Sequence, residues 1–162
     1  MFDPFSFVID KVEELMGHSP HPAIVTVPLG AFTVSNICDG LAAATGDKTY
    51  DDAARISMAV GLVGTAAAAV TGLRDYSRIP RDQEGHDIAT QHGIGNGVMA
   101  AMMATSYILR VRGKALHREA SVPARVLALG AGGLSLYTAW LGGKLVEELG
   151  EGVKRKVSSE EW

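Results

Sequence analysis

The chain has 162 residues, which suits a single domain, and 47% of them are hydrophobic. A formal net charge of -3, without basic runs interleaved with aromatic residues, argues against nucleic-acid binding. Because Cys38 is the single cysteine, the chain can form no internal disulfide and has too few cysteines to bind an iron–sulfur cluster.

The first segment of the chain, residues 1–20, is predicted to be an amphipathic helix. Phe5, Val8, Val12 and Leu15 recur at steps of three and four, whereas acidic residues dominate the other side. The acidic start is the wrong sign for a secretory signal. Helices that lie in a membrane interface usually carry Lys and Arg on the polar face. A place in the interface and packing against a partner or against the chain's own helices therefore both stay open.

Four stretches without charged side chains follow, at residues 22–38, 56–73, 88–109 and 126–143. Each has about the 20 residues that a helix needs to cross a membrane. Short polar connectors at 47–55, 74–87 and 110–120 separate them, which favours antiparallel neighbours. The mean hydropathy of +0.13 would also suit an alanine-rich soluble bundle, but these stretches lack polar outer faces. We predict an all-α fold, an integral membrane four-helix up-down-up-down bundle over residues 21–150, with a polar tail at 151–162.

This topology gathers polar side chains at two ends of the bundle. One end receives His21 and His92, together with Arg74 and Asp75 where the second stretch closes. At the other end lies Asp39, a carboxylate inside an apolar stretch. Carboxylates in such positions tend to pair with a base, so we expect an ion pair between Asp39 and either Arg55 or Arg125. The structural polar residues predicted here are Asp39, Arg55, Arg74 and Asp75.

The third stretch carries a stripe of chemically distinctive residues. His92, Asn96, Met99, Met103 and Arg110 follow one another at steps of four, three, four and seven, so they share one helix face. Bundles hold cofactors with side chains from facing helices, and imidazole is a common axial ligand of haem iron. The predicted metal ligands are His21 and His92, and the predicted cofactor-binding residues are His21, His92, Asn96 and Met99. A purely structural role for His92, through a hydrogen bond to Asn96 or to another helix, is the alternative.

A set of short motifs in a fixed order carries a family resemblance. They are His21-Pro22 with Val25 and Pro28-Leu29-Gly30, Asp39, Thr71-Gly72 with Asp75, His92 with Asn96, and Trp140-Leu141-Gly142-Gly143 with Leu145-Val146. Together they resemble the bacterial domain-of-unknown-function family 2231. The resemblance implies a four-helix domain in the bacterial inner membrane and, because some members look fused to Rieske iron–sulfur domains, a setting in electron transfer. Lys144 departs from the family pattern, in which an acidic residue is usual at that position.

Three functions are consistent with these features. The first is an accessory or anchor subunit of a membrane complex in electron transfer. The second is a redox membrane protein that binds haem b, or a related tetrapyrrole, through His21 and His92. The third is a proton or small-solute transporter that titrates Asp39, Asp75 and His92. No P-loop, HExxH motif or nucleophile elbow is present, so we expect no enzyme. The expected partners are the lipid bilayer, other membrane subunits or a second copy, and an iron–sulfur or other redox partner.

Overall fold

The computed structural model describes residues 4–116 and 119–152, and every regular element in that part of the chain is a helix. The helices are α1 (Pro4–Met16), α2 (His21–Ile24), α3 (Thr26–Thr45), α4 (Lys48–Tyr76), α5 (Glu84–Ala115) and α6 (Val122–Glu147). The predicted all-α class and the N-terminal helix are confirmed. Most of the predicted polar tail, residues 153–162, lies outside the described residues.

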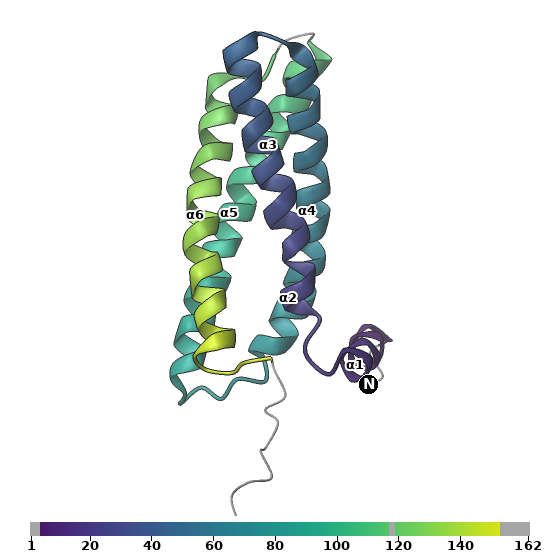
Figure 1. Ribbon diagram of the computed structural model, residues 1–162, viewed down its shortest axis with the longest axis vertical. Helices are drawn as coiled ribbons and strands as arrows, with labels where there is room; N and C mark the ends of the chain where they lie inside the picture. Colours follow the sequence, from purple (N-terminus) through teal and green to yellow (C-terminus); the bar gives the residue numbers. More distant parts are fainter. Residues whose placement is uncertain (1–3, 117–118, 153–162) are drawn as a thin grey trace, which may run out of the picture.

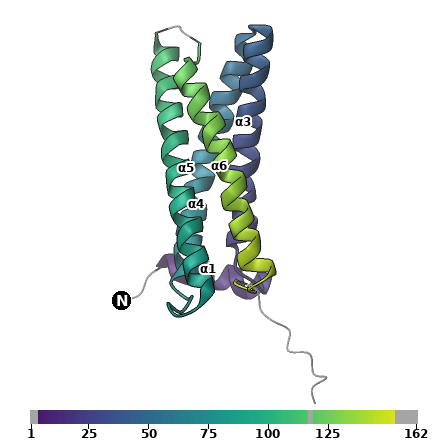
Figure 2. The same ribbon diagram turned by 90° about the vertical axis from the view of Figure 1, so that its left-hand side faces the viewer.

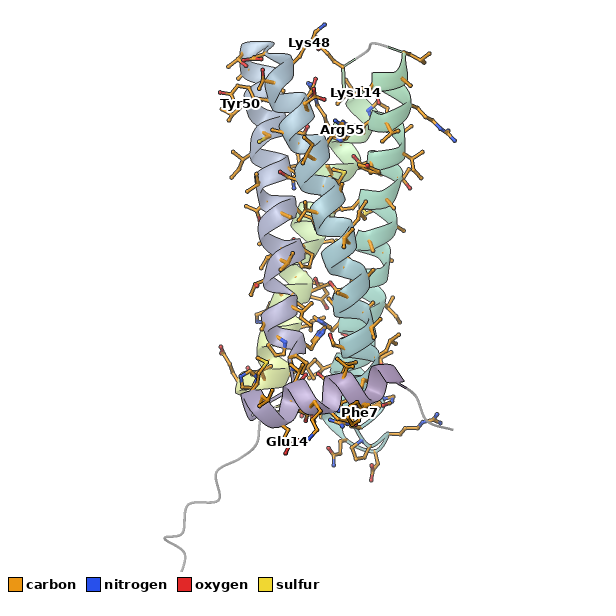
Figure 3. The ribbon with its side chains drawn as sticks, turned by 90° about the vertical axis from the view of Figure 1, so that its right-hand side faces the viewer. Phe7, Glu14, Lys48, Tyr50, Arg55 and Lys114 are labelled. Atoms are coloured by element: carbon orange, nitrogen blue, oxygen red, sulfur yellow. The ribbon has the colours of Figure 1, made fainter. Side chains whose placement is uncertain are left out.

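The long helices lie side by side, and each runs opposite to the one before it (Figures 1 and 2). α3 packs chiefly against α4, and α5 chiefly against α6, with fewer contacts between these two units. We call α2–α4 the first hairpin, α5–α6 the second hairpin, and the two together the bundle. The short helix α1 lies crosswise at one end of the bundle (Figure 3).

A break separates α2 from α3, although the sequence predicts one continuous helix there. Pro28 has no N–H with which to bond the Ile24 carbonyl one turn earlier, and α2 ends at Ile24. The chain then resumes as α3, which ends at Gly46, whose φ of 71° is the left-handed conformation that glycine adopts readily. The break leaves His21 at the start of a separate helical turn near the end of the bundle.

The helices extend further into the charged segments than the sequence pattern indicates. Residues 47–55 were expected to be a connector, but α4 begins at Lys48, and the Asp47 side chain accepts a hydrogen bond of 2.8 Å from the Thr49 N–H. An acidic residue at this position satisfies an amide that would otherwise lack a partner at the helix start. The charged residues Asp51, Asp52 and Arg55 therefore lie on the first turns of α4 rather than in a loop.

Three segments are long and apolar enough to cross a membrane by length and composition: His21–Thr45, Lys48–Tyr76 and Val122–Glu147. Their outward side chains include strongly exposed apolar residues, such as Leu73 at 69% and Leu129 at 70%. The predicted third stretch, residues 88–109, lies within α5, which does not reach the same hydropathy because it carries Gln91, His92 and Asn96. Residues 4–116 and 119–152 thus hold three candidate spans where the sequence pattern predicts four.

The larger of two clusters in the hydrophobic core lies between the two hairpins and contains residues from all four long helices. Its buried members are Phe32, Met58, Met99, Met103, Ala128 and Ala131. Gly61 of α4 faces the Phe32 ring so closely that a Cβ atom there would overlap it. Small residues on one helix therefore admit large ones from the next, which is how helices approach closely where water is absent.

Candidate functional site

His21, at the start of α2, is partly buried against α4. Its Nδ1 lies 3.1 Å from the Thr71 hydroxyl oxygen. Because the Thr71 hydroxyl donates its own proton to the Ala68 carbonyl at 3.1 Å, its oxygen is free to accept from Nδ1–H. A Cβ atom at Gly72 would lie 2.8 Å from the His21 Cε1 atom. Glycine at this position makes room for the ring.

His92, on α5, occupies a similar recess against α6. Its Nδ1 lies 2.8 Å from the Thr138 carbonyl oxygen, which can only accept, so Nδ1 carries the proton. Its Nε2 therefore holds a lone pair, and the Asn96 side-chain amide donates to it at 3.0 Å. A Cβ atom at Gly142 would lie 3.0 Å from the His92 Cε1 atom. The motif glycines Gly72 and Gly142 thus have the same role.

The two imidazoles meet between the hairpins. Their ring centroids are 6.4 Å apart, and their planes are almost perpendicular, at 84°. His92 uses Nδ1–H to bond its own hairpin, which orients the ring and leaves the lone pair on Nε2. The Thr71 hydroxyl is able to accept the same bond from Nδ1–H of His21. A histidine that ligates a metal is held in this way, with its second nitrogen donating to a carbonyl or similar acceptor.

The described residues offer no group of three or more His, Cys, Asp or Glu side chains that could hold a metal ion. A metal ion bound here would therefore have only two protein ligands from this set. Of the other predicted cofactor-binding residues, Asn96 contacts His92, whereas Met99 is buried in the hydrophobic core.

A network of polar side chains closes the same end of the bundle. The Ser19 hydroxyl donates to Asp75 at 2.5 Å and accepts from the His21 backbone N–H at 3.1 Å. Arg74 pairs with Asp10 and with Glu13 of α1, the latter at 2.7 Å. The predicted polar residues Arg74 and Asp75 therefore join α1, α2 and α4 next to His21.

α1 is attached through its acidic side. Arg78 adds a second contact to Glu13 at 2.9 Å, and the hydrogen bond from Arg74 holds the pKa of the Glu13 carboxyl below its usual value. The apolar side remains exposed, with Leu15 at 86%. Of the alternatives left open by the sequence, packing of the acidic face against the chain's own bundle is observed.

At the other end, Asp39 and Arg110 form a buried, two-pronged ion pair, with Nη to carboxylate oxygen distances of 2.7 and 2.5 Å. The prediction that Asp39 pairs with Arg55 or Arg125 is therefore wrong. Those arginines bind acidic residues of α4 instead, Arg55 to Asp52 and Arg125 to Asp51. Arg55 lies at the end of the bundle opposite α1, beside Lys114 (Figure 3). Arg110, the last residue of the predicted stripe, lies within α5, which continues to Ala115 beyond the predicted apolar stretch of residues 88–109.

The two hairpins repeat the same contacts. Asp39 and Arg110 are 71 residues apart, and the same spacing separates Ser35 from Ser106 and His21 from His92. The Ser35 hydroxyl donates to the Ala54 carbonyl at 2.9 Å, and the Ser106 hydroxyl donates to the Ala124 carbonyl at 2.6 Å. Equivalent positions of α4 and α6 are separated by one residue less. Identical residues at this spacing include Ala54 and Ala124, Arg55 and Arg125, and Gly72 and Gly142.

Equivalent positions of the two hairpins therefore meet twice along the bundle, once as the histidine pair and once as the Asp39–Arg110 pair. This repeat is not evident from the sequence pattern, because few residues are identical at the shared spacing. The repeat becomes visible when the chain is aligned with itself at an offset of 71 residues, the spacing that separates Asp39 from Arg110.

Residues 17–155 match the model of the family described as "Predicted membrane protein (DUF2231)". This range holds α2–α6 and leaves out most of α1. No curated protein and no solved structure matches the chain.

Proposed function

Because the chain belongs to the DUF2231 family of predicted membrane proteins, we propose that it holds haem b between His21 and His92 and serves in electron transfer in a bacterial inner membrane. The observation that carries the proposal is the histidine pair itself. Two imidazoles from equivalent positions, each contacting its own hairpin through Nδ1, lie between the hairpins with their ring centroids 6.4 Å apart.

The separation of the rings suits a single metal atom between them. An imidazole nitrogen binds a metal at about 2 Å, which places two rings on opposite sides of that metal with centroids about 6 Å apart. The observed centroid distance is 6.4 Å. Two histidine ligands are few for a free metal ion, but they suffice for haem, because the porphyrin brings the other four nitrogens.

The motif glycines at this end support the same assignment, because Gly72 and Gly142 make room for the rings within their hairpins. The Asn96 amide instead bonds the Nε2 atom of His92, and this hydrogen bond has to be replaced when that nitrogen binds iron. Haem supplies one-electron chemistry, and the protein sets its potential through the axial ligands and the burial of the site. Since Cys38 alone cannot hold an iron–sulfur cluster, an electron partner would be another protein, which fits the predicted role as a subunit of a larger membrane complex.

The proposal includes a fourth membrane span formed by α5. Its polar side chains His92 and Asn96 are partly buried toward the other helices, whereas Ile94 and Val98 are exposed. Polar residues in membrane helices usually face the bundle interior in this way. A helix with an apolar outer face can therefore span the bilayer even though its mean hydropathy is modest.

The test is the visible absorption spectrum of the full chain, purified in detergent after expression with ample haem. We expect the sharp bands of six-coordinate haem in the wild type, and loss or conversion of those bands in both His21→Ala and His92→Ala. His86→Ala is the matched control, because His86 lies on the same end of α5 but contacts Tyr76 instead. A wild-type protein without haem bands, or bands that survive in both histidine variants, would refute the proposal.

A further inference from the structure

The repeat of contacts between the hairpins breaks at one position beside the histidine pair. One helical turn after His92 stands Asn96, whereas one turn after His21 stands Val25, at the same spacing of 71 residues that separates Asp39 from Arg110. The Asn96 amide donates to the Nε2 atom of His92 at 3.0 Å. Val25 has no polar side-chain atom and can make no such bond. The Nε2 atom of His92 therefore already accepts a hydrogen bond from the side chain one turn later, whereas the Nε2 atom of His21 accepts none from position 25.

We propose that Asn96 is a positioning residue that holds the His92 lone pair in the ligand-free protein and makes His92 the second, weaker ligand of the pair. This inference rests on the proposed haem function. The hydrogen-bond directions agree with one another: the Thr138 carbonyl fixes the proton on Nδ1, so Nε2 can only accept, and only the amide nitrogen of Asn96 can donate to it. A haem iron that binds His92 has to replace this hydrogen bond, whereas His21 has no corresponding bond to its neighbour at position 25.

The size of the effect follows from the bond that is lost. A hydrogen bond between side chains contributes a modest net free energy, equivalent to about a two- to tenfold change in a binding constant. Asn96→Val copies the first hairpin and is expected to tighten haem binding by that factor. Val25→Asn copies the second hairpin and is expected to weaken it by a similar factor, because a new amide then competes for His21. The two substitutions have opposite predicted signs at equivalent positions, so each is the control of the other.

The experiment has two arms on the full chain in detergent. In the first, long-range proton–nitrogen NMR of histidine labelled with nitrogen-15 is recorded without haem. We expect His92 to carry its proton on Nδ1 in the wild type and in Asn96→Val. The Nε2 resonance is expected to move toward that of an unbonded nitrogen in the variant. In the second arm, haem is titrated into wild type, Asn96→Val and Val25→Asn, and the affinities are compared.

The outcomes separate this inference from the proposed function. If haem binds but neither affinity nor the His92 Nε2 resonance changes in Asn96→Val, the positioning role is wrong while the haem site stands. If no variant binds haem, the proposed function fails, and with it the role of Asn96 in ranking the ligands. A shifted Nε2 resonance together with tighter binding supports the inference.

Discussion

Exchange of the two charges in the buried ion pair tests the equivalence of the hairpins. The Asp39 and Arg110 side chains are only 9% and 2% exposed, and Arg110 Nε also donates to the Ser106 hydroxyl at 3.2 Å. Removal of one partner of a buried pair costs about 3–5 kcal/mol, because the other charge stays buried and unpaired. We therefore expect Asp39→Asn and Arg110→Met each to lower the free energy of unfolding by about that amount.

The double variant Asp39→Arg with Arg110→Asp is expected to recover most of this loss. Ser35 stands four residues before position 39, as Ser106 stands four residues before position 110, so an arginine at position 39 finds the same hydroxyl partner. Lys114→Met is the matched control at the same end. Its pair with Asp52 is 52% exposed on both sides, and exposed pairs contribute about 1 kcal/mol or less.

Unfolding in detergent, followed by circular dichroism against temperature or denaturant, measures all four variants. The reasoning would be refuted by a double variant as unstable as the single ones, or by single variants as stable as the wild type. The first result would mean that positions 39 and 110 are not interchangeable. The second would mean that the pair is not buried in the folded protein.

Two further predictions concern packing and pH. Gly61→Ala places a methyl group against the Phe32 ring and is expected to destabilise the bundle by about 1–3 kcal/mol, whereas Gly133→Ala, with open space at its Cβ, is expected to be neutral or slightly stabilising. Thermal unfolding distinguishes the two. Because the hydrogen bond from Arg74 lowers the pKa of Glu13, the attachment of α1 is expected to persist above the usual carboxyl pKa of 4.5 and to weaken as the pH falls through the lowered value. Hydrogen exchange of α1 at a series of pH values should show this loss, and Glu13→Gln should reduce the pH dependence, leaving the part that belongs to the Asp10 pair with Arg74.

Much of the fold follows from the sequence because apolar runs and charged breaks specify helices directly. The stripe from His92 to Arg110 also faces the bundle interior, since Met99, Met103 and Arg110 are buried. The helical periodicity alone was enough to predict that these residues share one face. The gathering of His21 and His92 at one end followed in turn from the alternation of helix directions.

The pairing of individual side chains across helices was not predictable in the same way. It depends on how far each helix is rotated about its axis and on which neighbour packs against it, and a hydropathy pattern predicts neither. Asp39 was therefore paired with the wrong arginines, although Arg110 was already on the stripe of the facing helix. The roles of Gly72 and Gly142 were equally hidden, because only the packed structure shows that each recess holds a histidine ring.

Low-temperature electron paramagnetic resonance of the oxidised, haem-loaded protein tests the central claim most directly. Two axial imidazoles whose planes are parallel split the iron d orbitals and give a rhombic low-spin signal, whereas perpendicular planes leave those orbitals nearly degenerate and give a signal of large anisotropy. With the His21 and His92 planes at 84°, we expect the highly anisotropic low-spin form. A high-spin signal, or no haem signal at all, would contradict ligation of haem by this pair of histidines.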